Sequence, residues 1–141
     1  MDRVTLDTVS LDDFWDLVVM MDALKHEMEP DTATNDVNLY RNYMVNRIKS
    51  AYIYHIPKCG FVMLDSLQDI LLKDAAKNYW IMQHIYVVPE KRKGTTYARL
   101  LNTVIEKHEG QIIGLTFKQS DHNAVLQKRY KVLGTIYGRY D

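Results

Sequence analysis

The chain has 141 residues, and its 18 basic and 18 acidic side chains leave no formal net charge. We expect one domain, residues 1–141, with one substantial core, and the balanced charge argues against a protein that coats nucleic acid. No apolar run approaches the roughly 20 residues that cross a bilayer, so no membrane partner is expected, and the single cysteine, Cys59, suits a reducing compartment such as the cytoplasm.

The first third of the chain predicts one strand and two helices. Residues 3–9 alternate apolar and polar side chains, as a half-buried strand does. Ser10 is a candidate N-cap, and Asp13, three residues on, completes a variant of the capping box. This helix is expected to end before Pro30, because proline disfavours helical backbone in the residue before it. A polar loop then leads to a second helix that ends near residue 49.

The middle of the chain predicts a hairpin followed by a long strand. Residues 51–55 and 61–65 read as two strands around a turn that contains proline and glycine. Residues 66–78 are predicted to be mostly loop. The apolar run over residues 79–88 is predicted to be the longest strand.

The last third predicts a strand–helix–strand return. A helix is expected over about residues 95–109, with Gly110 as its C-cap. Residues 112–117 are apolar, as in a central strand covered on both faces, and a short return of this kind makes the two strands parallel. A last helix is predicted over about residues 123–133, and a final strand over residues 136–140.

The passage from the long strand into the next helix is the most informative segment. It reads Val87-Val88-Pro89-Glu90-Lys91-Arg92-Lys93-Gly94, and Thr95, Thr96 and Tyr97 follow. Backbone N–H groups at a helix N-terminus lack internal acceptors, and the helix dipole adds a favourable potential for anions. We therefore predict that this turn binds the phosphates of a nucleotide-like cofactor. The alternative is a solvated basic turn whose threonines only cap the helix.

A second pattern lies on the predicted last helix. Asn123, Leu126, Tyr130 and Leu133 recur at spacings that place them on one helix face, and Gly134 follows. Tyr130 is therefore expected to reach the same cleft as Asn123. A packed tyrosine with a satisfied hydroxyl is the alternative.

The two patterns and the element order together resemble the GNAT superfamily of acyl-CoA N-acyltransferases. The first pattern is similar to the family's strand ending in Val-x-Pro-Glu-x-Arg and its Arg/Gln-x-x-Gly-x-Gly/Ala turn. The second is similar to the family's Asn-(six residues)-Tyr-x-x-Leu-Gly-Phe helix. Thr95, Tyr97 and Thr135 depart from these motifs at a Gly, a Gly/Ala and a Phe position. The small size and the Arg-x-Gly-Thr-Thr turn also resemble acetyltransferase-like proteins of bacteriophages.

The resemblance implies a fold and a set of contacts. The fold would be α/β (α+β), with a mixed, mostly antiparallel sheet, helices on both faces and a splayed central strand pair. The co-substrate would be acetyl-CoA. Its predicted contacts are Val87, Val88, Arg92, Lys93, Gly94, Thr95, Thr96, Tyr97 and Asn123.

The resemblance also implies roles for two side chains. Tyr130 would protonate the departing CoA thiolate, and a phenol with a pKa of about 10 keeps its proton at neutral pH. His84 would take the proton of the ammonium, directly or through water, although a structural partner is the alternative for a lone histidine on a strand. The other four histidines show no metal-ligand spacing, so we expect no metal and only surface or capping roles for them.

The predicted function is an N-acetyltransferase in which a primary amine, on a small molecule or a protein, attacks the thioester directly. One alternative is a catalytically inactive GNAT-fold protein with a structural or assembly role, such as a phage virion component. Another is a CoA-binding module without turnover. The acidic stretch over residues 27–36 is read as a wall of the acceptor site or as a solvated loop. A homodimer through the C-terminal strand or an assembly partner stays open.

Overall fold

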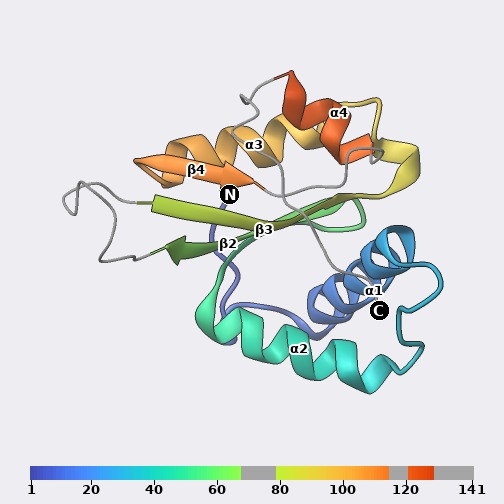
Figure 1. Ribbon diagram of the computed structural model, residues 1–141. Coiled ribbons are helices and arrows are strands. Elements are labelled where there is room, and N and C mark those ends of the chain that lie inside the picture. Colours follow the sequence, from blue (N-terminus) through green and yellow to red (C-terminus); the bar gives the residue numbers. More distant parts are fainter. Residues whose placement is uncertain (68–78, 115–120, 129–141) are drawn as a thin grey trace.

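The computed structural model describes residues 1–67, 79–114 and 121–128 (Figure 1). Its first helix, α1 (Leu11–Met28), begins as the sequence predicts, because Ser10 Oγ accepts the N–H of Asp13 at 3.1 Å. The second helix, α2 (Val37–Ser50), is capped in the same way, with Asp36 Oδ1 accepting the N–H of Asn38 at 2.9 Å. No described helix is both long and apolar enough to cross a membrane.

The prediction of a strand over residues 3–9 is wrong. Thr5 and Thr8 instead close a turn, in which their hydroxyls and backbone groups bond to one another. Local bonds of this kind compete with a strand ladder. The segment still adjoins the sheet, because Val4 donates its N–H to the carbonyl of Ile53 at 2.8 Å.

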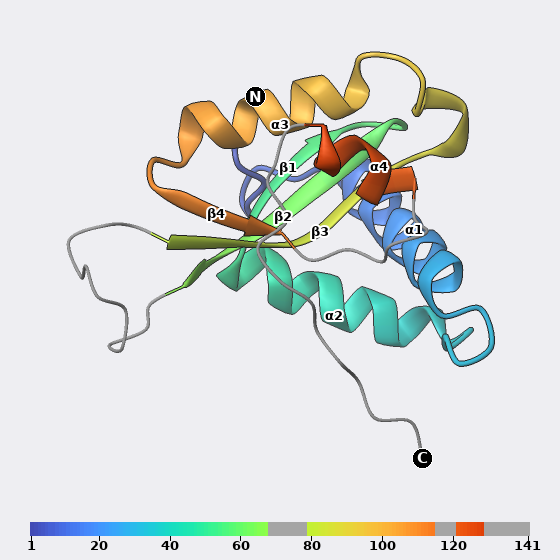
Figure 2. The ribbon, with the colours of Figure 1, turned by 45° about the horizontal axis from the view of Figure 1, so that its top comes forward.

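The sheet has four strands in the order β1-β2-β3-β4 (Figure 2). The predicted hairpin is confirmed as β1 (Tyr52–Ile56) and β2 (Gly60–Leu67), and β2 pairs antiparallel with β3 (Tyr79–Val87). Strand β4 (Gln111–Gly114) runs parallel to β3, as the short helical return predicts. The fold is therefore the expected mixed, mostly antiparallel α/β arrangement.

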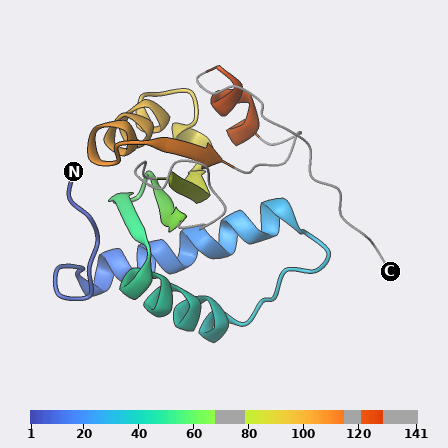
Figure 3. The same ribbon diagram turned by 60° about the vertical axis from the view of Figure 1, so that its left-hand side comes forward.

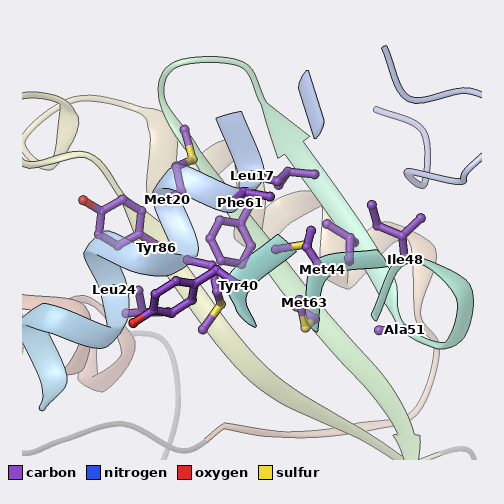
Figure 4. Close-up of a cluster of buried hydrophobic side chains, with 13 residues drawn as sticks. Leu17, Met20, Leu24, Tyr40, Met44, Ile48, Ala51, Phe61, Met63 and Tyr86 are labelled. Atoms are coloured by element: carbon purple, nitrogen blue, oxygen red, sulfur yellow. The ribbon is translucent and has the colours of Figure 1, made fainter. Parts of the chain in front are cut away.

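Helices cover both faces of the sheet (Figure 3). Helices α1 and α2 lie on one face, and α3 (Thr96–Lys107) and α4 (Asp121–Gln127) lie on the other (Figure 1). The core beneath α1 and α2 contains four methionines, which fill irregular gaps between branched side chains (Figure 4). The core beneath α3 holds Val62, Ile85, Val87, Leu100 and Leu101. The predicted helix over residues 123–133 and strand over residues 136–140 lie largely outside the described residues.

Strand β3 contains a β-bulge that the sequence does not reveal. Met63 opposes His84 and Leu64 opposes Met82, so Gln83 is an extra residue on β3. A bulge bends its strand and redirects side chains. Here it places Met82 in the core beneath α3 and leaves Gln83 exposed, while His84 hydrogen-bonds to Tyr43 of α2.

Gly60 is required where the hairpin meets β3. A Cβ atom at this position would lie 2.5 Å from the carbonyl oxygen of Tyr86 and 3.2 Å from the Cα of Val87. Both are backbone atoms of a paired strand and cannot move aside easily. We expect Gly60→Ala to lower the free energy of unfolding by roughly 1–3 kcal/mol in urea titrations, as overpacking does.

Gly94 provides the matched control for this substitution. A Cβ at Gly94 would meet only the carbonyl oxygen of Lys91, at 3.6 Å, which is ordinary contact. Gly94→Ala should therefore unfold at the wild-type urea concentration. Equal losses in the two variants would contradict the tight approach at Gly60.

Candidate functional site

A short 3₁₀ turn, η1 (Pro89–Lys91), connects the end of β3 to the first residues of the predicted phosphate-binding turn. Val88 donates its N–H to the carbonyl of Cys59 at 2.8 Å, which fixes the start of the turn to the β1–β2 hairpin. Within the turn, Lys91 donates to the carbonyl of Val88 at 2.9 Å and Gly94 donates to that of Lys91 at 3.2 Å. The turn is therefore shaped by its own backbone hydrogen bonds.

Several backbone donors remain at the start of α3. In the described part of the chain, the structure shows no acceptor for the N–H groups of Lys93 and residues 95–98. The Thr95 side chain makes no capping hydrogen bond, and Lys93, Gly94 and Thr95 are exposed. Unpaired donors at the positive end of a helix dipole provide the chemistry that binds a phosphate.

The described part of β4 pairs with only the first half of β3. Pairing with β4 is seen from Tyr79 to Met82, and among the described residues β4 supplies no partner from Gln83 to Val87. The Val87 side chain is fully buried, and its carbonyl accepts the Nε–H of Arg92 at 2.8 Å. The described pairing of β3 with β4 thus ends just before the bulge residue Gln83, where the described part of β4 also ends.

Arg92 is predicted to contact a phosphate, but the structure shows its guanidinium engaged by carboxylates. Two hydrogen bonds of 2.7 Å join its Nη2 to Glu27 of α1, and Nη1 donates to Asp121 of α4 at 3.0 Å. The Arg92 side chain is 13% exposed. The sequence offers no signal for the contact with Glu27, because the two residues are 65 positions apart.

Tyr97, which stands at a small-residue position of the motif, points into the protein. It is 4% exposed and its hydroxyl hydrogen-bonds to Nδ1 of His122 on α4. The ring of His122 also lies 5.9 Å from that of Tyr86. Tyr97 thus links α3 to α4 through its side chain, and its backbone N–H stays among the unpaired donors.

His84 is brought to α2 and not to the predicted turn. Its Nε2 and the hydroxyl of Tyr43 are 2.9 Å apart. Burial, followed by the positive charges of Lys25 and Arg47, lowers the pKa of His84 to about 4. The side chain is therefore neutral at pH 7 and a weak proton acceptor.

The expectation of surface or capping roles is wrong for His55 and His122, whereas His108 is the C-cap of α3, although it is buried. His108 and His122 are 4% and 5% exposed, and the His55 side chain is 3% exposed. His55 Nε2 bonds to the buried Asp16 at 2.7 Å, and His108 Nε2 lies 2.8 Å from the hydroxyl of Tyr54. Within the described ranges no group of His, Cys, Asp and Glu side chains could hold a metal ion.

The described residues include only part of the second sequence pattern. Helix α4 includes Asn123, whose side chain is outside the description, as is all of Tyr130. Two carboxylates of the acidic stretch over residues 27–36 make contacts within the fold. Glu27 binds Arg92 and Asp36 caps α2, so these two carboxylates are not free to form a wall.

Comparisons with solved structures identify the fold. The chain is similar to a GCN5-related N-acetyltransferase from Ralstonia eutropha, with 12% identity, a TM-score of 0.68 and coverage of 94% of this chain and 95% of that one. The chain is also similar to a ribosomal-protein-alanine N-acetyltransferase from Brucella melitensis, with 12% identity and a TM-score of 0.66. The match covers 94% of this chain and 96% of that one. A third similar structure is an aminoglycoside acetyltransferase from a soil metagenome, in complex with sisomicin, with 13% identity and a TM-score of 0.63. The match covers 99% of this chain and 95% of that one. At these identities the likeness establishes an acetyltransferase fold.

Comparisons at the level of sequence add no relative. No protein-family model matches the chain, and no curated protein matches it either.

Burial of His84 predicts a pH-dependent stability. Its pKa of about 4 in the folded protein lies below the ordinary 6.5, so the unfolded chain binds more protons between these values. Stability should therefore fall as the pH drops from 6.5 towards 4, with a contribution from His84 on the order of 3 kcal/mol. Urea unfolding at pH 7, 5.5 and 4.5 measures this loss.

The control for this measurement is His84→Gln, which keeps a hydrogen-bonding side chain near Tyr43 but does not titrate. The variant should lose less stability on acidification than the wild type. All other titrating groups are shared, so identical losses in the two proteins would contradict the low pKa.

Proposed function

We propose that this protein is an acyl-CoA-dependent N-acyltransferase that moves an acetyl group from acetyl-CoA to a primary amine. The observation that carries the proposal is the set of backbone donors at residues 93 and 95–98 that find no acceptor in the described part of the chain, directly after strand β3. This arrangement occurs within a fold shared with acetyltransferases of three different descriptions.

The residues at the turn fit a diphosphate held mainly by backbone groups. The donors of residues 95–98 lie in the first turn of α3, and the exposed Lys91 and Lys93 add positive charge beside them. Gly94 and Thr95 are exposed, so no side chain there buries the donors. Thr96 and Tyr97 are buried, so any contact they make with the phosphates would come from their N–H groups and not from their side chains.

The edge of β3 suits the pantetheine arm. Backbone groups of residues 83–86, for which the described part of β4 supplies no partner, can pair with an extended chain, as sheets do when they accept an added strand. A backbone N–H near Val87 would then polarise the thioester carbonyl. Asn123 on α4 would steady the same arm.

The reaction itself needs proton transfers at both nitrogen and sulfur. Acetyl-CoA supplies an activated thioester, and the amine nitrogen forms the new C–N bond as the C–S bond breaks. Tyr130 would donate its phenolic proton to the departing sulfur. His84, with a pKa of about 4, suits a hydrogen bond that orients a water molecule near the amine better than it suits storage of the proton. One ammonium proton would then leave through that water, and the second proton that the nitrogen loses as the amide forms would restore the Tyr130 phenol.

The acceptor is proposed only as a primary amine. One solved structure with this fold is described as acting on a ribosomal-protein alanine, and another holds the aminoglycoside sisomicin. Both a protein amine and a small-molecule amine are therefore compatible with the architecture. The inactive assembly protein, including the phage-like form, and the CoA-binding module remain the alternatives that activity assays decide.

Binding is the first prediction of this proposal. Acetyl-CoA at 1 mM should raise the melting temperature, because a ligand present at about 100 times its Kd stabilises the folded state by roughly 2.7 kcal/mol. For a chain of this size that corresponds to a shift of several degrees. Pantetheine lacks the phosphates and should produce little shift in the same thermal scan. No shift with acetyl-CoA would favour the assembly role.

Turnover is the second prediction. With an amine panel and acetyl-CoA, the wild type should release free thiol, and Tyr130→Phe should reduce the rate by roughly 100-fold or more, as loss of a general acid does. Tyr79→Phe, at the start of β3, is the matched control and should keep wild-type activity. Binding without thiol release in the wild type would identify a CoA-binding module.

A further inference from the structure

Arg92 is held by three parts of the fold at once. Its Nε donates to the carbonyl of Val87 at 2.8 Å, while its two terminal nitrogens donate to Glu27 and Asp121. These contacts join α1, the end of β3 and α4 to the turn that precedes α3. The guanidinium therefore has protein acceptors for each of its three nitrogens.

Glu27 is the stronger of the two carboxylate partners. Both of its oxygens lie 2.7 Å from Nη2 of Arg92, and its side chain is 41% exposed. Asp121 makes one contact of 3.0 Å and is 70% exposed. Charge-assisted bonds to a guanidinium that is mostly buried exceed ordinary surface ion pairs in strength.

The charge of this group opposes the binding of an anion. One guanidinium and two carboxylates leave one net negative charge. The first unpaired backbone donor belongs to Lys93, the residue next to Arg92. A phosphate bound at the turn would therefore meet both the attraction of the α3 N-terminus and the repulsion of the carboxylates.

We propose that Glu27 limits the affinity of the phosphate site, because its carboxylate holds the Arg92 guanidinium and competes for it with the diphosphate of CoA. The inference rests on the proposed function, and it assigns a role to a residue of α1 that lies far from the turn in sequence. In this account Arg92 contacts the ligand only to the extent that Glu27 releases it.

The test compares CoA dissociation constants by isothermal titration calorimetry. Glu27→Gln keeps the shape of the side chain and removes its charge, so CoA should bind about 3- to 10-fold more tightly than to the wild type. The gain should be smaller in the Glu27→Gln/Arg92→Gln double variant relative to Arg92→Gln alone, because only the repulsion by Glu27 is then relieved and no guanidinium remains to be released. Pantetheine, which carries no phosphate, should show no gain.

Glu29→Gln is the matched control, because it makes the same chemical change two residues away on an exposed side chain that the structure does not bond to Arg92. Its CoA affinity should change less than 2-fold. Asp121→Asn provides a second variant if Glu27→Gln fails to fold, and it should give a smaller gain in the same direction.

The outcomes separate this inference from the proposed function. Wild-type binding of CoA with no gain in Glu27→Gln, or with an equal gain in Glu29→Gln, overturns the role of Glu27 alone. A gain of undiminished size in the Arg92→Gln background also overturns it. Failure of the wild type and every variant to bind CoA overturns the proposed function, and the inference with it.

Discussion

The pairing of β3 is the constraint on which the rest of the site depends. One edge of the strand pairs with β2 along its length, while the described part of β4 pairs only from Tyr79 to Met82. The bulge at Gln83 follows these four pairs along β3. Backbone hydrogen-bonding groups that lack a strand partner need another acceptor or donor. An extended ligand along this edge would satisfy them and would end at the unpaired donors of α3.

Several buried side chains have contacts other than those that the sequence suggests. Arg92 and Tyr97 occupy motif positions, yet their side chains connect elements of the fold through Glu27 and His122. The backbone then becomes the main source of donors for a phosphate, together with exposed lysines. Burial also keeps His84 neutral, which changes the expected path of the amine proton. The same packing that stabilises the turn therefore sets its electrostatics.

The fold was predictable where local chemistry determines it. The cap at Ser10, the hairpin turn and the short helical return each specify an element from a few neighbouring residues, and the structure confirms them. Residues 3–9 were misread because their threonines bond locally. The Gln83 bulge and the contact of Arg92 with Glu27 were not predictable, since both depend on tertiary packing and have no local composition signal. The sequence therefore did not predict the side-chain contacts of the turn before α3.

The central claim is that backbone N–H groups at the start of α3 bind the diphosphate of CoA. Amide NMR on uniformly ¹⁵N-labelled protein during a CoA titration tests it most directly. The account predicts that the largest saturable shifts fall on Lys93 and residues 95–98, and that pantetheine leaves these amides nearly unchanged. Saturable shifts confined to other parts of the protein, with these five amides unaffected, would contradict it.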